Sequence, residues 1–139
     1  MRLLQLGPNG RVTITKDLLP HEITRYEYAI LSHTWGPDEE ELTFQDVNGG
    51  TGLKKKGYQK ILFCGQQAAV NNLDYFWVDT CCIDKRNLTE YAEAINSMFR
   101  WYHGASRCYV YLEDVVRNDP VHGHELPRST WKLAFRNSH

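Results

Sequence analysis

Residues that could carry chemistry gather in two clusters, and each cluster follows a short apolar run. The first comes after the run 28–31 and holds a hydroxyl, an imidazole and an indole: Ser32, His33 and Trp35. The second comes after the run 75–78 and holds two carboxylates, a thiol and two cations: Asp79, Cys82, Asp84, Lys85 and Arg86. Side chains of these types could hold a nucleotide, coordinate a metal ion or activate a thiol.

A metal site is the first interpretation of the acidic residues. Asp79, Asp84 and the pair Glu113-Asp114 offer the oxygen ligands that Mg²⁺ prefers. The chain has no Walker A sequence and no G-x-G-x-x-G, which excludes the nucleotide sites built on those loops. Strand-end carboxylates more often cap turns and helix N-termini. We therefore expect no metal site, and we interpret His122 and His124 as surface residues.

A cysteine nucleophile is the second interpretation. Cys82 lies just before an expected helix N-terminus, which would lower the pKa of its thiol, and His33 is the candidate base. The competing interpretation is that Cys81 and Cys82 are two small side chains packed at a strand end. No pair of cysteines has the C-x-x-C spacing, and adjacent strand residues point to opposite faces. The sequence leaves the thiol question open.

The expected secondary structure would bring the two clusters together. Apolar runs predict strands within 26–35, 73–80 and 106–115, and helical spacing predicts helices over 57–71 and 87–104. This alternating order predicts the α/β class, with a parallel sheet and helices on both faces. Ligands bind such sheets beyond the carboxyl ends of the strands, where both clusters fall.

Two further elements are expected around this framework. The period of "RVTITKDL" (11–18) predicts an additional strand. The second helix should pack through one apolar stripe, made of Leu88, Tyr91, Ile95, Met98 and Tyr102. The stretch 37–52 is acidic and then rich in turn residues, so we expect a surface loop with one helical turn at "FQDV" (44–47).

Composition restricts the class of protein. The chain has 139 residues, which favours one domain over 1–139, and its formal net charge is −1. No global field would attract nucleic acid or an anionic membrane, so neither is expected as a partner. No apolar run approaches the ~20 residues that span a bilayer, and the first residues lack the pattern of a signal peptide. Since the four cysteines are better interpreted as reduced thiols, we expect a cytoplasmic protein.

Several long blocks, in order, resemble a known family. They are the opening "MRLLQL", "YAILSHTWG" (28–36), "GYQKILFCGQQA" (57–68), "YFWVDTCCIDK" (75–85) and "EAINSMFRWYHGASRCYVYLEDV" (93–115). Together they resemble the fungal heterokaryon-incompatibility (HET) domain over nearly the whole chain. The resemblance implies a domain that triggers programmed cell death after recognition of non-self. It also implies partners that carry the same domain or a nucleotide-binding oligomerisation module.

The resemblance further implies a fold and a reaction. The family is distantly similar to TIR domains, which have a flavodoxin-like parallel sheet, and some TIR domains cleave NAD⁺ with a glutamate. The family continues past "FRNS" with a W-T-L-Q-E-L block whose glutamate is the best counterpart, whereas this chain stops at His139. We therefore expect the 139-residue form to be inactive, with Asp79 and Asp84 as weak stand-ins for the catalytic carboxylate. An unpaired sheet edge would favour self-association.

Three functions fit these patterns. The leading hypothesis is a cell-death effector that acts by self-association, without a tightly bound cofactor and with NAD⁺ as a substrate of the complete domain. Its ligand would be held by the two clusters at the strand ends, with Lys85 or Arg86 neutralising charge. The second hypothesis is a non-catalytic interaction module or decoy that pairs with full-length HET proteins. The third is a small hydrolase that uses Cys82 and His33.

Overall fold

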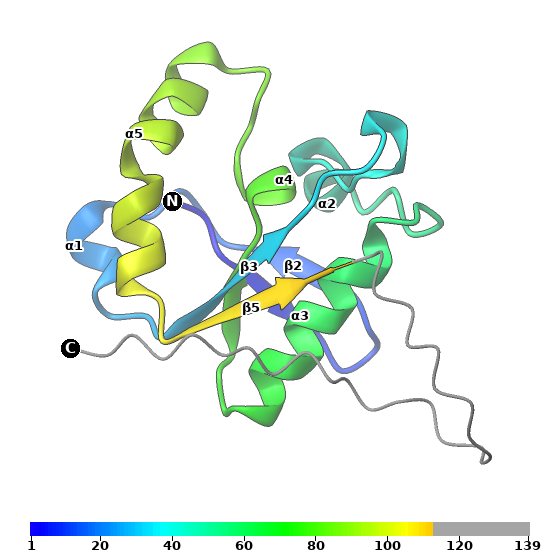
Figure 1. Cartoon of the computed structure of the whole chain (residues 1–139), viewed down its shortest axis with the longest axis horizontal. Helices are drawn as coiled ribbons and strands as arrows, with labels where there is room; N and C mark the ends of the chain where they lie inside the picture. Colours follow the sequence, from blue (N-terminus) through cyan, green and yellow to red (C-terminus); the bar gives the residue numbers. More distant parts are fainter. Residues whose placement is uncertain (113–139) are drawn as a thin grey trace.

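A computed structural model describes residues 1–112, which form a five-stranded sheet with helices packed against it (Figure 1). The strands are β1 (Leu4–Leu6), β2 (Val12–Ile14), β3 (Tyr28–His33), β4 (Tyr75–Trp77) and β5 (Arg107–Tyr111). The helices are α1 (Pro20–Ile23), the 3₁₀ turn η1 (Asp38–Glu40), α2 (Phe44–Gly49), α3 (Tyr58–Val70), α4 (Asp79–Cys82) and α5 (Leu88–Gly104). The predicted residues Glu113, Asp114, His122 and His124 lie outside the described part.

The sheet is mixed, with the strand order β2-β1-β4-β3-β5. Its centre is parallel, because β3 pairs in parallel with both β4 and β5, as the alternation of strands and helices predicted. The other side is antiparallel: β1 pairs with β2 and also with β4. The predicted α/β class is confirmed. The antiparallel hairpin was not predicted, although its second strand was.

Helices cover both faces of the parallel centre. Tyr109 is paired with Leu31, and its hydroxyl donates to the Gln67 carbonyl of α3 at 3.1 Å. Trp77 projects to the opposite face, where its ring packs against Trp101 of α5 with centroids 5.5 Å apart. Successive strand residues point to opposite faces, so α3 and α5 must lie on opposite sides of the sheet. Figure 1 shows this sandwich, with α5 standing on the side away from α3.

The core lies at the central strands. The first four residues of β3 are buried, and Phe76 and Trp77 of β4 are almost inaccessible. Continuous apolar runs are typical of strands that are covered on both faces, which is why these two were predictable. Among the described residues, no helix is long and apolar enough to cross a bilayer.

Helix α5 packs differently from the prediction. Its capping was predicted correctly, since the Asn87 side chain accepts a hydrogen bond from the Glu90 amide. The predicted stripe was correct in part, because Tyr91, Met98 and Tyr102 are partly buried against the core. Leu88 and Ile95 are exposed instead, and Ala94 is the buried residue of the helix. The helix approaches the sheet most closely at the small residue Ala94. In this orientation Leu88 and Ile95 point away from the sheet.

Candidate functional site at the carboxyl edge of the parallel strands

The two predicted clusters meet around the carboxylate of Asp79. Oδ1 of Asp79 lies 2.8 Å from Nε2 of His33, and Oδ2 accepts a hydrogen bond from Nε1 of Trp35 at 2.9 Å. His33 ends β3, and Asp79 begins α4, separated from the end of β4 by one residue. The parallel register of the two strands therefore brings these side chains to one edge. The His33 side chain is only 1% exposed. The carboxylate of Asp79 therefore binds a buried imidazole at the end of β3 and an indole from the loop that follows β3.

Trp35 is the accessible member of this cluster. The residue is 54% exposed although its indole N–H is bonded to Asp79. The ammonium of Lys85 lies 4.2 Å from the centroid of the indole ring, which is the geometry of a cation–π contact. A fixed, half-exposed indole beside a cation is a surface on which an aromatic or anionic ligand could stack.

A buried ion pair holds the loop that carries Trp35. Nζ of Lys60 lies 2.6 Å from Oε1 of Glu41, and the two side chains are 5% and 10% exposed. Lys60 also donates to the Thr34 carbonyl at 3.0 Å, and Glu41 accepts from the Gly36 amide at 2.8 Å. The residues on either side of Trp35 are thus bonded to one ion pair.

Neither member of this ion pair was predicted. Glu41 stands at the end of an acidic run that was interpreted as surface loop. Lys60 lies within a helix predicted from its apolar residues, and lysines are usually exposed. A signal was nevertheless present, because Lys60, Cys64 and Ala68 lie at i, i+4 and i+8 on the buried face of α3.

The start of α3 touches the same loop directly. The Gly57 amide donates to the Glu40 carbonyl at 2.7 Å. A Cβ atom at Gly57 would lie 2.6 Å from that carbonyl oxygen and 3.0 Å from Cα of Glu41. Only glycine allows the helix to approach the loop this closely.

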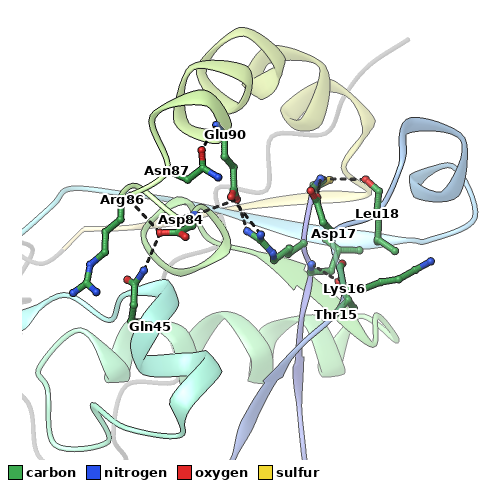
Figure 2. Close-up of polar contacts among 12 residues, drawn as sticks. Thr15, Lys16, Asp17, Leu18, Gln45, Asp84, Arg86, Asn87 and Glu90 are labelled. Carbon is green, nitrogen blue, oxygen red and sulfur yellow. Dashed lines mark hydrogen bonds and ion pairs between the residues drawn. The ribbon is translucent and has the colours of Figure 1, made fainter.

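Asp84 belongs to a neighbouring network rather than to the Asp79 cluster (Figure 2). Its Oδ1 accepts from the Gln45 side chain at 2.8 Å and from the Arg86 amide at 3.2 Å. Its own amide donates to Oε1 of Glu90, which is also ion-paired with Arg2. In Figure 2 the Arg86 guanidinium extends away from the Asp84 carboxylate. Asp84 therefore joins α2 to the start of α5.

The thiols lie in the core. Cys82 is 3% exposed, and its Sγ accepts a hydrogen bond from the Val78 amide at 3.4 Å. Burial raises the pKa of both Cys64 and Cys81 well above the usual range of a thiol. The expectation that Cys81 lies on a strand was wrong, because it belongs to the short helix α4. His33 bonds to Asp79, so its placement does not favour the thiol–imidazole pair.

Ser32 lies on the α5 side of the site, together with a hydroxyl that was not predicted there. The Tyr102 hydroxyl donates to the Leu31 carbonyl at 3.4 Å. Burial, together with the nearby negative charge of Asp79, raises the pKa of Tyr102 to about 12, while a hydrogen bond with Ser32 opposes the rise. Tyr102 was interpreted only as part of an apolar stripe. It contributes a hydroxyl beside the site.

A cavity of about 540 Å³ lies near this edge but is built from other residues. Its walls come from α5 and from the segment 17–28, including Leu18, Ile23 and Trp101. Cys82 is the predicted ligand-binding residue that reaches it. The cavity size suits a small ligand. His33, Trp35 and Asp79 do not line this cavity, so the cluster around Asp79 is a separate site in which Trp35 is the exposed residue.

The chain is thus an α/β protein with a His–Asp–Trp cluster at the carboxyl ends of its parallel strands. The family model that matches is "Heterokaryon incompatibility protein (HET)", over residues 28–138, and the chain belongs to this family. It is 53% identical over 136 residues to the vegetative incompatibility protein HET-E-1 of Podospora anserina. That alignment covers 98% of this chain but 10% of the relative. No solved structure matches the chain significantly.

Proposed function

We propose that this domain is a signalling module of heterokaryon incompatibility that triggers cell death by self-association after recognition of non-self. The observation that carries the proposal is the 53% identity to a vegetative incompatibility protein over 98% of the chain. The proposed partners are further copies of the domain and other proteins of the HET family, and the proposed compartment is the cytoplasm. The proposed mode of action is assembly.

A controlled-expression experiment tests this role. Inducible expression of the chain in fungal cells should kill them, and Lys60→Met, which leaves the ion partner of Lys60 unpaired under the Trp35 loop, should abolish killing at equal protein level. Lys54→Met, on an exposed lysine, is the matched control and should keep killing. Normal growth of cells that accumulate the folded wild-type chain would contradict the proposal.

We also infer that the strand-end site binds NAD⁺ in a TIR-like manner. The supporting geometry is the half-exposed Trp35 ring, on which a base could stack, with Lys85 beside it to pair with phosphate. The two oxygens of Asp79 are already bonded to His33 and Trp35. This carboxylate is therefore poorly placed to stabilise a cationic transition state, and we expect this chain to bind NAD⁺ without cleaving it.

Binding and turnover are measured separately. Titration with NAD⁺ should shift the NMR signal of the Trp35 indole, and Trp35→Ala and Lys85→Gln should each weaken binding by about tenfold. Lys54→Gln should leave the affinity unchanged. Cleavage of NAD⁺ by the 139-residue chain, followed by chromatography, would show that our interpretation of Asp79 is wrong. Absence of any shift would favour the alternative, a non-catalytic interaction module.

A further inference from the structure

The cavity of about 540 Å³ beside α5 has small residues along its helical wall. Ala94, Ser97 and Gly104 line it at i, i+3 and i+10, so they share one side of the helix. Short side chains at these positions leave space between α5 and the segment 17–28, which includes α1, and Figure 1 shows α1 beside α5. The volume of this space lies within the range of small-ligand sites.

Large apolar side chains supply the other walls of this cavity. Leu18 and Ile83 are buried, and Ile23 and Trp101 are partly buried against the core. Tyr28 also lines the cavity, but its hydroxyl already donates to the Trp101 carbonyl at 2.6 Å. A ligand would therefore meet mainly apolar surface along its middle, and this part of the ligand should be apolar.

The charged residues that line the cavity differ in whether they have ionic partners. Asp17 pairs with the N-terminal ammonium at 2.6 Å, and Glu90 pairs with Arg2. Glu93 and Arg100 are exposed, and within residues 1–112 neither of them forms an ion pair. The cavity therefore has one acid and one base whose charges the described residues leave unneutralised.

Glu93 and Arg100 give the cavity two ends of opposite charge. They are seven residues apart, which is two turns, or about 10 Å along α5. The Arg100 guanidinium donates to the Ser97 hydroxyl at 3.2 Å, which leaves further N–H donors for a carboxylate. The Glu93 carboxylate accepts hydrogen bonds, so it suits an ammonium group. The complementary ligand carries an anion and a cation about 10 Å apart.

We propose that this cavity binds a short apolar peptide with both termini free, its C-terminal carboxylate on Arg100 and its N-terminal ammonium on Glu93. An extended chain spans roughly 3.3–3.6 Å per residue, so about three residues cover the distance between the two charges. A single amino acid is too short to reach both, and a fatty acid has no cation for Glu93. Leu19 and Thr24 line the cavity and are exposed, so one side is open and the peptide amides stay hydrated. The inference does not rest on the proposed function.

Isothermal titration calorimetry of the full chain with trileucine tests this site. The dissociation constant should lie between roughly 10 µM and 1 mM, because the cavity is open and the ligand is small. Two chemically matched peptides separate the two ends: N-acetyl-trileucine lacks the ammonium, and trileucine amide lacks the carboxylate. Each should bind about tenfold more weakly than trileucine, because each loses one charged contact.

Variants of the two charged residues assign each end of the peptide. Arg100→Gln should bind trileucine and its amide with about equal affinity, and Glu93→Gln should do so for trileucine and its N-acetyl form. Ser97→Leu narrows the cavity and should abolish binding. Arg11→Gln, on an exposed arginine outside the cavity, is the matched control and should leave the affinity unchanged. Circular dichroism confirms that each variant is folded.

Each outcome decides the proposal. Absence of binding at millimolar trileucine, or equal affinity for all three peptides, would overturn it. Unchanged affinity in Ser97→Leu would place the peptide outside the cavity, and a charge variant that still discriminates between its two peptides would remove the assigned contact. The proposed function fails separately: a chain that kills cells without binding trileucine refutes only this site. A chain that binds trileucine without killing cells refutes only the signalling role.

Discussion

Lys60 and Glu41 form a buried ion pair, with 2.6 Å between Nζ and Oε1, directly beneath the loop that carries Trp35. Removing one partner of a buried pair leaves an uncompensated charge, which costs more than the pair itself contributes. We expect Lys60→Met to lower the free energy of unfolding by about 3–5 kcal/mol, as measured by urea denaturation.

Two controls accompany this variant. The double change Lys60→Met/Glu41→Leu should recover part of the loss, since no buried charge remains. Lys16→Met, which removes an exposed partner of Glu22, should leave the urea midpoint essentially unchanged. Equal midpoints for Lys60→Met and the wild type would show that the pair is solvated.

The lowered pKa of Asp46 lets us predict how the stability of the fold falls in acid. Burial alone would raise its pKa, but hydrogen bonds from Lys55, Thr43 and Thr51 prevail and lower the pKa from 3.8 to about 2. A carboxylate with a depressed folded-state pKa stabilises the fold above the unfolded pKa, and this stabilisation is lost as pH falls from about 4 to about 2.

The corresponding variant is Asp46→Asn. We expect it to lower the free energy of unfolding at pH 7 by about 1–2 kcal/mol, a figure reduced for solvent screening. Between pH 4 and 2 the difference from the wild type should shrink, because protonation removes the same charge in the wild type. A difference that is constant across this range would indicate a loss unrelated to ionisation.

Tyrosine ionisation gives a test at alkaline pH. Burial raises the pKa of both Tyr28 and Tyr102 to about 12. A raised pKa means that the fold favours the neutral phenol, so this contribution to stability is complete below pH 10 and is lost as pH approaches 12. In an absorbance titration of phenolate, Tyr102→Phe should remove about half of the late-titrating signal that these two residues supply. An unchanged late phase would place Tyr102 in solvent.

Asp79 should control the position of Trp35. In Asp79→Asn the amide can accept fewer hydrogen bonds, so His33 and the Trp35 indole compete for one oxygen. We expect faster hydrogen exchange of the Trp35 indole N–H by NMR and a stability loss of about 1–3 kcal/mol. Asp74→Asn, on an exposed aspartate directly before β4, is the matched control and should change neither quantity. Slow indole exchange in Asp79→Asn would show that the loop is held without this carboxylate.

The central strands were predictable because their chemistry is local. Tyr28 through Leu31 and Tyr75 through Val78 are continuous apolar runs, which only a strand covered on both faces accommodates in so short a length. Strand β1 was missed because its pairing partners, Ile14 and Phe76, are distant in sequence and its three residues are too few to show a period. Its assignment depends on the hairpin and not on its own composition.

The site was predictable only in part, for a related reason. His33, Trp35 and Asp79 were found because strand ends converge in a parallel sheet. Helical period located α5, but it could not show which side meets the sheet, since small Ala94 rather than Ile95 makes the close approach. The role of a charged residue such as Lys60 depends on its ion partner, Glu41, which the spacing of apolar residues along a helix does not reveal.

The contact at Gly57 bears on how this family can vary in sequence. The helix and the loop meet there backbone to backbone, with no side chain between them that could be exchanged for a smaller one. A single methyl group would have to displace the main chain of Glu40 and Glu41, and with it the turn that aims the indole. Position 57 therefore admits no substitution that keeps the loop in place.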